Sequence, residues 1–204
     1  MNEKFFSLPE KKQQAIINAG YRVFSSNSYN KSPMQEIADA AGISKSLLFH
    51  YFQNKKDLYM FLWERCAVKT IECMTKYRCY EQKDLFECMY RGMQAKLYLM
   101  REYPEMARFA VKAFYEKDPQ IHTAVHESYR KYFDMKAGKT LMMLDSAQFV
   151  PGLDIKMMYR DMFLASEGYL WEKVREGNID TDETERDFRE MIEFWKSVYL
   201  KKEV

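Results

Sequence analysis

Apolar side chains recur at every third or fourth position along most of this 204-residue chain, a period that predicts amphipathic α-helices. Short polar breaks, several of them with proline or glycine, separate these stripes, and we find no convincing strand. We therefore predict an all-α protein of about nine helices. The helices are expected at residues 7–25, 32–41, 44–52, 54–76, 84–102, 105–116, 118–144, 155–176 and 181–200.

The second and third predicted helices are short and are joined by a tight turn. Ser32 and Gln35 have the spacing of a capping box, which predicts where the first of these helices begins. Gly42 is expected to end that helix, because a residue without Cβ readily takes the left-handed backbone conformation. Ser44 then has the character of a cap for the following helix. Two short helices that cross steeply after such a turn form a helix-turn-helix, a motif that reads DNA.

The segment from residue 42 to residue 58, GISKSLLFHYFQNKKDL, resembles the DNA-binding segment of the TetR/AcrR family of bacterial transcriptional regulators. The close resemblance covers roughly the first quarter of the chain. Two positions depart from the family pattern: Leu47 replaces a small or polar residue, and Phe49 replaces a tyrosine whose hydroxyl commonly contacts phosphate. Both changes remove hydrogen-bonding capacity and favour apolar contact, for instance with thymine methyl groups. The positions that agree are Ile37, Ala38, Gly42, Ser44, Lys45, Leu48, His50, Tyr51, Phe52, Lys55 and Leu58.

The resemblance, together with the expected exposure of the second short helix, implies how the chain would bind double-stranded DNA. That helix is expected to enter the major groove. Residues 1–56 carry eight Lys/Arg against four Asp/Glu, a charge of +4 on a chain whose net charge is +2, which fits phosphate contact in this part. The residues expected to face bases are Lys45, Ser46, Leu47 and Phe49, and those expected to hold phosphates are Ser32, Ser44, His50, Tyr51 and Lys55.

A division into three parts follows from the same resemblance. We expect a helix-turn-helix domain at residues 1–53, a connecting helix at 54–76, and a ligand-binding and dimerisation domain at 77–204. The last two predicted helices are expected to join a homodimer, because one is apolar on more than one side and the other carries a long apolar stripe. The chain would then be a repressor that binds a near-palindromic operator as a dimer and is released by a small lipophilic or aromatic effector.

The carboxy-terminal part is dense in Met, Tyr and Phe, which is compatible with an ordinary core. The family resemblance favours an effector cavity between its helices instead. None of the candidate lining residues belongs to a recognised motif. They are Phe86, Met89, Met93, Phe114, Tyr129, Phe133, Phe163 and Glu167.

Few features support catalysis or metal binding, so we expect neither an enzyme nor a cofactor. His122 and His126 have a spacing that can bind one metal ion, but two ligands do not make a site and no H-E-x-x-H motif is present. The four cysteines form no C-x-x-C pair, and no signal-like segment or 18-residue apolar stretch occurs, so we expect a reduced, cytoplasmic protein without a membrane segment. The alternative function is a sensing or scaffolding helical protein whose DNA-binding domain no longer reads sequence.

Overall fold

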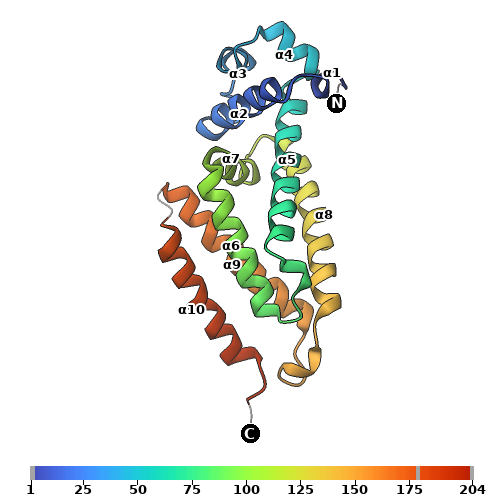
Figure 1. Cartoon of the computed structure of the whole chain (residues 1–204), viewed down its shortest axis with the longest axis vertical. Coiled ribbons are helices and arrows are strands. Elements are labelled where there is room, and N and C mark those ends of the chain that lie inside the picture. The colour runs from blue at the N-terminus through green and yellow to red at the C-terminus, as the bar shows by residue number, and fades with distance from the viewer. Residues whose placement is uncertain (1–2, 178–179, 203–204) are drawn as a thin grey trace. The chain divides into compact units, whose positions relative to one another are not determined.

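The structure, a computed structural model, describes residues 3–177 and 180–202 (Figure 1). Within these residues it contains ten α-helices and two short 3-10 helices, which confirms the predicted all-α class. The first α-helix was not predicted, because four residues are too few to show a periodic stripe. The elements are α1 (Glu3–Phe6), α2 (Glu10–Ser26), α3 (Met34–Ala41), α4 (Lys45–Tyr51), α5 (Lys55–Lys76), η1 (Cys79–Glu81), α6 (Leu85–Glu102), α7 (Pro104–Phe114), α8 (Pro119–Met143), η2 (Ser146–Gln148), α9 (Ile155–Glu176) and α10 (Thr181–Tyr199).

Contacts along the chain define two compact units that alternate in sequence. Unit 1 comprises Met1–Lys69 and Tyr103–Arg130, and unit 2 comprises Thr70–Glu102 and Lys131–Val204. Helices α5 and α8 therefore contribute residues to both units. The compact units do not coincide with the linear boundary expected at residue 77, because α7 packs on α2 and so belongs with the amino-terminal helices.

Aromatic side chains hold the helices of unit 1 together. Phe109 of α7 is completely buried, and its ring lies 5.4 Å from the ring of Tyr21 on α2 and 4.9 Å from that of Tyr59 on α5. Phe5 of α1 is also completely buried and lies 5.2 Å from the ring of Phe61 on α5. Aromatic pairs at these separations add to the free energy gained by burial. These rings therefore fix α1, α2, α5 and α7 as one packed body.

The core of unit 2 is formed mainly by α6, α9 and α10. On α10 the side chains of Phe188, Ile192 and Trp195 are buried in this core, at 1%, 5% and 4% exposure. These three residues of the apolar stripe that we expected at a dimer interface are therefore buried within one chain. The buried residues of the cluster are Leu85, Phe86, Met93, Leu97, Phe149, Met158, Tyr159, Met162, Leu170, Phe188, Ile192 and Trp195.

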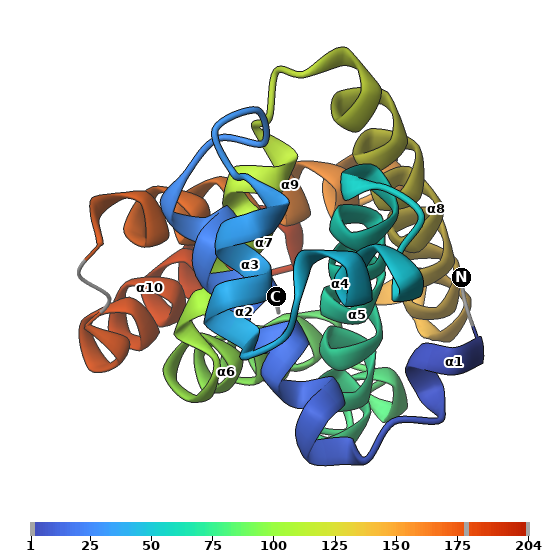
Figure 2. The ribbon, with the colours of Figure 1, turned by 90° about the horizontal axis from the view of Figure 1, so that it is seen from above.

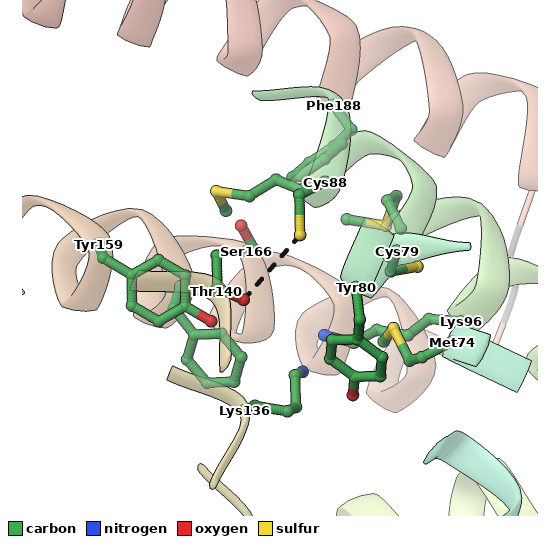
Figure 3. A pocket seen from close by; sticks show the side chains of 14 residues that line it. Met74, Cys79, Tyr80, Cys88, Lys96, Lys136, Thr140, Tyr159, Ser166 and Phe188 are labelled. Carbon is green, nitrogen blue, oxygen red and sulfur yellow. Dashed lines mark hydrogen bonds between the residues drawn. The ribbon is translucent and has the colours of Figure 1, made fainter. Parts of the chain in front are cut away.

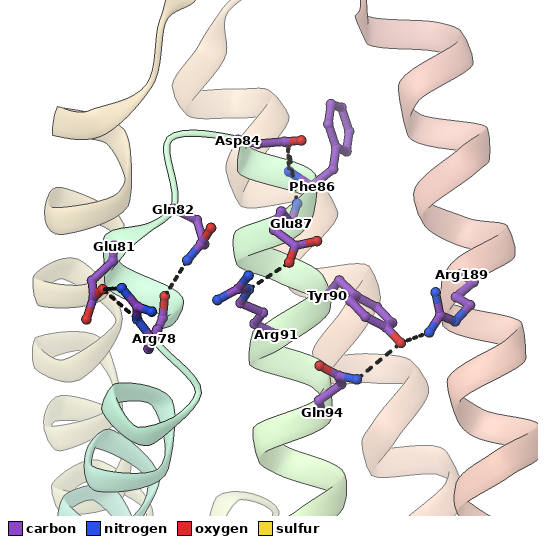
Figure 4. A network of polar contacts seen from close by, with 10 residues as sticks. All are labelled: Arg78, Glu81, Gln82, Asp84, Phe86, Glu87, Tyr90, Arg91, Gln94 and Arg189. Carbon is purple, nitrogen blue, oxygen red and sulfur yellow. Dashed lines mark hydrogen bonds and ion pairs between the residues drawn. The ribbon is translucent and has the colours of Figure 1, made fainter.

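A polar network also joins α6 to α10 (Figure 4). The Tyr90 hydroxyl accepts a hydrogen bond from Arg189, as Figure 4 shows. It also donates one to Glu185. Gln94, one turn along α6, donates to the same hydroxyl oxygen at 3.2 Å. Because a tyrosine hydroxyl can donate once and accept twice, this network uses its full hydrogen-bonding capacity.

All four cysteines of the chain are free thiols, as the absence of a paired spacing predicted. Three of them are buried, and the fourth, Cys88, is half-buried. In the described part of the chain, no helix is long and apolar enough to span a bilayer.

Candidate nucleic-acid interface and ligand cavity

A sharp turn at Gly42 joins α3 to α4, as the sequence predicted (Figure 2). Gly42 has φ +69°, a backbone conformation that strains residues with a Cβ. The next residue, Ile43, donates its N–H to the carbonyl oxygen of Ala38 at 3.0 Å, so the turn closes back on α3. This is the hydrogen-bonding pattern of a glycine-ended helix, and it sets the direction in which α4 leaves.

Helix α4 has only seven residues and is held by its inner side. Leu48 is completely buried and Tyr51 is 8% exposed, so this face packs against the rest of unit 1. At the start of the helix, the Ser44 hydroxyl accepts a hydrogen bond from the Leu47 N–H at 3.2 Å. The predicted cap is therefore confirmed, and it satisfies one of the amides that a helix start leaves without a partner.

The outer side of α4 carries the residues that we expected to meet bases. Leu47 and Phe49 are 37% and 39% exposed. Lys45, Ser46 and His50 are exposed as well. The structure therefore presents all four predicted base-facing residues, together with His50, at the surface of one short helix.

Ser32 corrects the prediction for the start of α3. The helix begins after Pro33 and has no side-chain cap, whereas the Ser32 hydroxyl donates to the carbonyl oxygen of Ser28 at 2.9 Å. Ser32 has no exposed surface, so its side chain is not available to a phosphate in this structure. The prediction of Ser32 as the cap was wrong because the Pro33 ring fixes an extended backbone before the helix and directs Ser32 inward.

Lys55, predicted to hold a phosphate, has a role within unit 1. Its ammonium group donates to the carbonyl oxygen of Tyr29 at 2.8 Å and lies 4.4 Å from the centre of the Tyr29 ring. The Tyr29 N–H in turn donates to the Glu116 carboxylate at 2.8 Å. Lys55 therefore ties the loop after α2 to the start of α5. This contact uses one of the three N–H donors of the ammonium group.

Unit 2 contains a cavity of about 50 Å³ (Figure 3). Its wall is largely apolar, but two amino groups, two thiols and several hydroxyls also line it. Figure 3 shows the side chains of Lys96 and Lys136 reaching toward the space beside the Tyr80 ring. The lining residues are Met74, Cys79, Tyr80, Cys88, Met89, Gly92, Met93, Lys96, Lys136, Thr140, Tyr159, Phe163, Ser166 and Phe188.

Three of the eight predicted lining residues, Met89, Met93 and Phe163, line this cavity. The other five do not, for four reasons. Phe86 is buried in the core, and Phe133 packs behind the wall with its ring 4.7 Å from that of Phe163. Glu167 pairs with the lining residue Lys96. Phe114 and Tyr129 pack on each other in unit 1, with their rings 4.9 Å apart.

The two lysines of the cavity were missed, although a signal for them exists in the sequence. Lys96 continues the apolar series Met89 and Met93, at the next helical position on the same side of α6. Lys136 likewise follows Phe133 by three residues on α8. A charged residue inside an apolar stripe indicates either a buried ion pair or a site, because burying an isolated charge is costly.

Burial changes the acidity of the groups around this cavity. Burial lowers the pKa of Lys136 to about 8, and the nearby Cys79 and Cys88 only partly offset this. Burial lowers the pKa of Lys96 as well, with the Lys136 charge acting in the same direction and Cys79 in the opposite one. Burial raises the pKa of Cys79 to about 12, so this group is a protonated thiol at neutral pH and a poor nucleophile. The arrangement therefore suits binding better than covalent chemistry.

The histidine pair considered for metal binding is accounted for by other contacts. His122 and His126 have ring centres 4.2 Å apart, but His126 is hydrogen-bonded to the Phe114 carbonyl at 3.0 Å and His122 to the Glu116 carbonyl at 3.2 Å. Across residues 3–177 and 180–202, no group of three or more His, Cys, Asp or Glu residues could hold a metal ion.

Comparison with known proteins agrees with this geometry. Residues 16–60 match the family model described as bacterial regulatory proteins, tetR family. Over 158 residues the chain is 22% identical to the fatty acid metabolism regulator protein of Bacillus subtilis (strain 168), covering 74% of this chain and 78% of that protein.

Solved structures extend the likeness beyond the matched segment. A TetR family transcriptional regulator from Chloroflexus aurantiacus J-10-FL has a TM-score of 0.66 at 23% identity, over 98% of this chain and 99% of its own. NalD, the secondary repressor of the MexAB-OprM multidrug efflux pump in Pseudomonas aeruginosa, has a TM-score of 0.73 at 15% identity, over 95% and 99%. The helix-turn-helix segment is therefore that of the TetR family of DNA-binding transcriptional regulators, as the sequence predicted, and the chain shares its fold with solved regulators of that kind.

The charge of Lys136, a half-buried residue, leads to a prediction about stability. Because its native pKa of about 8 lies below its ordinary value of 10.5, the folded state loses this proton first as the pH rises. Between these two values the unfolded state binds more protons, so this group makes the protein more stable as the pH increases. At pH 7 the charged group should cost about 1–3 kcal/mol.

Lys136→Met should therefore raise the free energy of unfolding at pH 7 by this amount, and its advantage over the wild type should shrink by pH 9.5. Urea unfolding of both proteins at the two pH values measures the effect. Lys131→Met, on the exposed surface of the same helix, is the matched control and should change stability by less than about 0.5 kcal/mol. If Lys136→Met is more stable than the wild type by the same free energy at both pH values, the lowered pKa of Lys136 is contradicted.

Proposed function

We propose that this chain is a ligand-responsive repressor that reads a near-palindromic DNA operator with helix α4. The observation that carries the proposal is the outer side of α4, where Lys45, Leu47 and Phe49 are exposed on a helix whose inner side is buried. Lys45 and Ser46 would hydrogen-bond base edges, whereas Leu47 and Phe49 would contact thymine methyl groups. Ser44 and His50 would hold phosphates, whereas Tyr51, also predicted to do so, is buried on the inner side of the helix.

The same proposal assigns the effector to the cavity of unit 2. Helix α5 begins in unit 1 at Lys55 and ends in unit 2 at Lys76, so a shift of its last turns can reach its first turns through a continuous hydrogen-bonded helix. In a dimer, that shift would change the separation of two α4 helices, which must match about one turn of DNA, roughly 34–36 Å. Effector binding would then lower the affinity for the operator.

We further propose that the homodimer forms through the outer sides of α9 and α10, since regulators of this family form dimers. Met157 and Leu164 on α9 are 59% and 52% exposed, and Phe194 and Val198 on α10 are 64% and 45% exposed. Each pair repeats at helical spacing, which makes two apolar edges that are not covered within one chain. Val198 belongs to the stripe that we expected on the last helix, whereas Phe188, Ile192 and Trp195 of that stripe are buried within one chain and are no longer proposed as the contact.

The first prediction from this proposal concerns sequence reading. Selection from a pool of random DNA duplexes should enrich one near-palindromic sequence, and band-shift titration should show it to bind at least 100-fold more tightly than unselected DNA at moderate salt. Lys45→Ala should weaken binding to that sequence about 10-fold or more, because a good base contact contributes about 1–3 kcal/mol.

The control for this prediction is Lys83→Ala, which removes an exposed lysine from unit 2 and should leave the affinity unchanged. If no sequence is enriched, and Lys45→Ala binds random DNA as the wild type does, the repressor proposal fails. The sensing or scaffolding alternative would then be the better account.

A second prediction concerns the dimer. The double variant Leu164→Glu with Phe194→Glu should convert a protein of twice the chain mass to one of single mass, because charges would be buried in an apolar interface. Light scattering measures the mass, and circular dichroism checks that the helices remain. Met142→Glu, which changes an 88% exposed apolar residue of α8, is the control and should stay dimeric.

Trp195→Glu is not a suitable test of the interface, because this side chain is buried with its ring 6.0 Å from that of Phe188. That substitution would unfold unit 2 whatever the oligomeric state. A wild-type chain of single mass at micromolar concentration would reject the dimer.

A further inference from the structure

The charges around the cavity of unit 2 do not balance. Lys96 and Lys136 both line it, and Lys96 forms an ion pair with Glu167 of α9. The side chains of this pair are only 16% and 11% exposed, so the two charges neutralise each other at the edge of the core. Among the described residues, no carboxylate lies within ion-pair distance of Lys136. The cavity therefore carries one positive charge without a partner.

The surroundings of Lys136 stabilise its charge only weakly. Its ammonium group lies 4.8 Å from the centre of the Phe163 ring, a cation–π contact, and Lys96 lies 5.4 Å from the same ring centre. One aromatic ring is therefore shared between two cations. In Figure 3 both lysine side chains reach the same side of the cavity, where their mutual repulsion adds to the cost of burial.

A second and independent observation concerns Tyr80. Its hydroxyl group is buried and has no hydrogen-bond partner, although it belongs to the lining of this cavity. A buried hydroxyl without a partner costs about 1–3 kcal/mol, so native structures rarely leave one without a reason. Tyr80 therefore offers a hydrogen-bond donor without an acceptor, close to the Lys136 ammonium group, which has no anionic partner.

The rest of the wall is suited to an apolar group. Met74, Met89 and Met93 line the cavity together with Phe163 and Phe188. Methionine side chains are flexible and polarisable, so they can adapt to the shape of a ligand. At about 50 Å³ the cavity has room for a few water molecules only, and a ligand must push these side chains aside to enter.

We propose that this cavity binds a monoanionic amphiphile, with a carboxylate against Lys136 and the Tyr80 hydroxyl and an apolar chain along the methionine wall. One negative charge matches the one unpartnered positive charge. The two oxygens of a carboxylate can accept from the lysine and from the tyrosine at the same time. This inference deepens the proposed function, since it names the class of effector for the same cavity.

The test is titration calorimetry of the full chain with three compounds that share an eight-carbon chain: octanoate, 1-octanol and octylamine. At pH 7 octanoate should bind at least 10-fold more tightly than octanol, and octylamine should not bind measurably. Lys136→Met should reduce the octanoate preference to less than threefold, and Lys136→Arg should restore much of it. Lys131→Met, an exposed lysine on the same helix, should keep the full preference.

The pH dependence of octanoate affinity distinguishes direct binding by Lys136 from a purely structural role, because a structural role would not make the affinity follow the Lys136 charge. The groups facing Lys136 are Lys96 and Cys88 of α6, Cys79 and Tyr80 of η1, and Tyr159 of α9, with Glu167 behind Lys96. Since Lys136 has a pKa of about 8, octanoate affinity should fall as the pH rises above this value, while octanol affinity stays constant. The fall should disappear in Lys136→Met.

Two results would overturn the inference: octanol binding as tightly as octanoate, or Lys136→Met keeping the full preference for octanoate. Cooperative unfolding of Lys136→Met, and its binding to the selected DNA without ligand, show that the variant is folded. The inference can fail while the repressor proposal stands, because the wild type would still bind its selected DNA. Loss of selective DNA binding in the wild type would instead remove the proposed function.

Discussion

The recognition surface depends on the packing of two helices that are too short to be stable alone. Helix α3 has eight residues and α4 has seven, whereas isolated helices shorter than roughly 12–15 residues are marginal in water. Their conformation is therefore imposed by burial of Ile37, Ala38 and Leu48, all of which are completely inaccessible to solvent. Because Gly42 sets the turn, the inner side of α4 packs against the rest of unit 1. Its outer side is then fixed in direction without contributing to the core.

The cavity of unit 2 differs from unit 1 in how its buried polar groups are partnered. In unit 1 the buried groups satisfy one another, as in the contact of Lys55 with the Tyr29 carbonyl. In unit 2 the half-buried Lys136 and the buried Tyr80 hydroxyl are left without such partners among the described residues. Proteins tolerate this cost at places where a ligand supplies the missing partner. The same imbalance that lowers the stability of the free protein would give an anionic ligand its affinity.

Sequence reasoning was most reliable where local chemistry decides the structure. The glycine at position 42 and the Ser44 cap were predictable, because turn and cap preferences depend on a few neighbouring residues. The capping role of Ser32 was wrong, because the neighbouring Pro33 and the buried loop outweighed the local pattern. The sides of α9 and α10 were harder still. Both helices have apolar residues on two sides, and only the packed structure distinguishes the buried Trp195 from the exposed Phe194.

The cavity shows a further limit of periodicity. Apolar stripes identified the helices that form it but not the residues at its wall, since Phe114 and Tyr129 share the spacing of core residues and pack in unit 1. The informative positions were the exceptions, Lys96 and Lys136, where a charge interrupts a stripe. Treating charged residues within an apolar stripe as candidates would have identified these two lysines from the sequence.

The central claim is that a ligand in unit 2 controls DNA binding by unit 1. The most direct measurement is the dissociation constant for the selected DNA, obtained by band shift with and without saturating octanoate, in the wild type and in Lys136→Met. The account predicts that octanoate weakens DNA binding by about 10-fold or more in the wild type, within the usual range of coupling energies of 1–3 kcal/mol, and has little effect in the variant. Octanoate that binds the wild type but leaves its affinity for DNA unchanged would contradict the account.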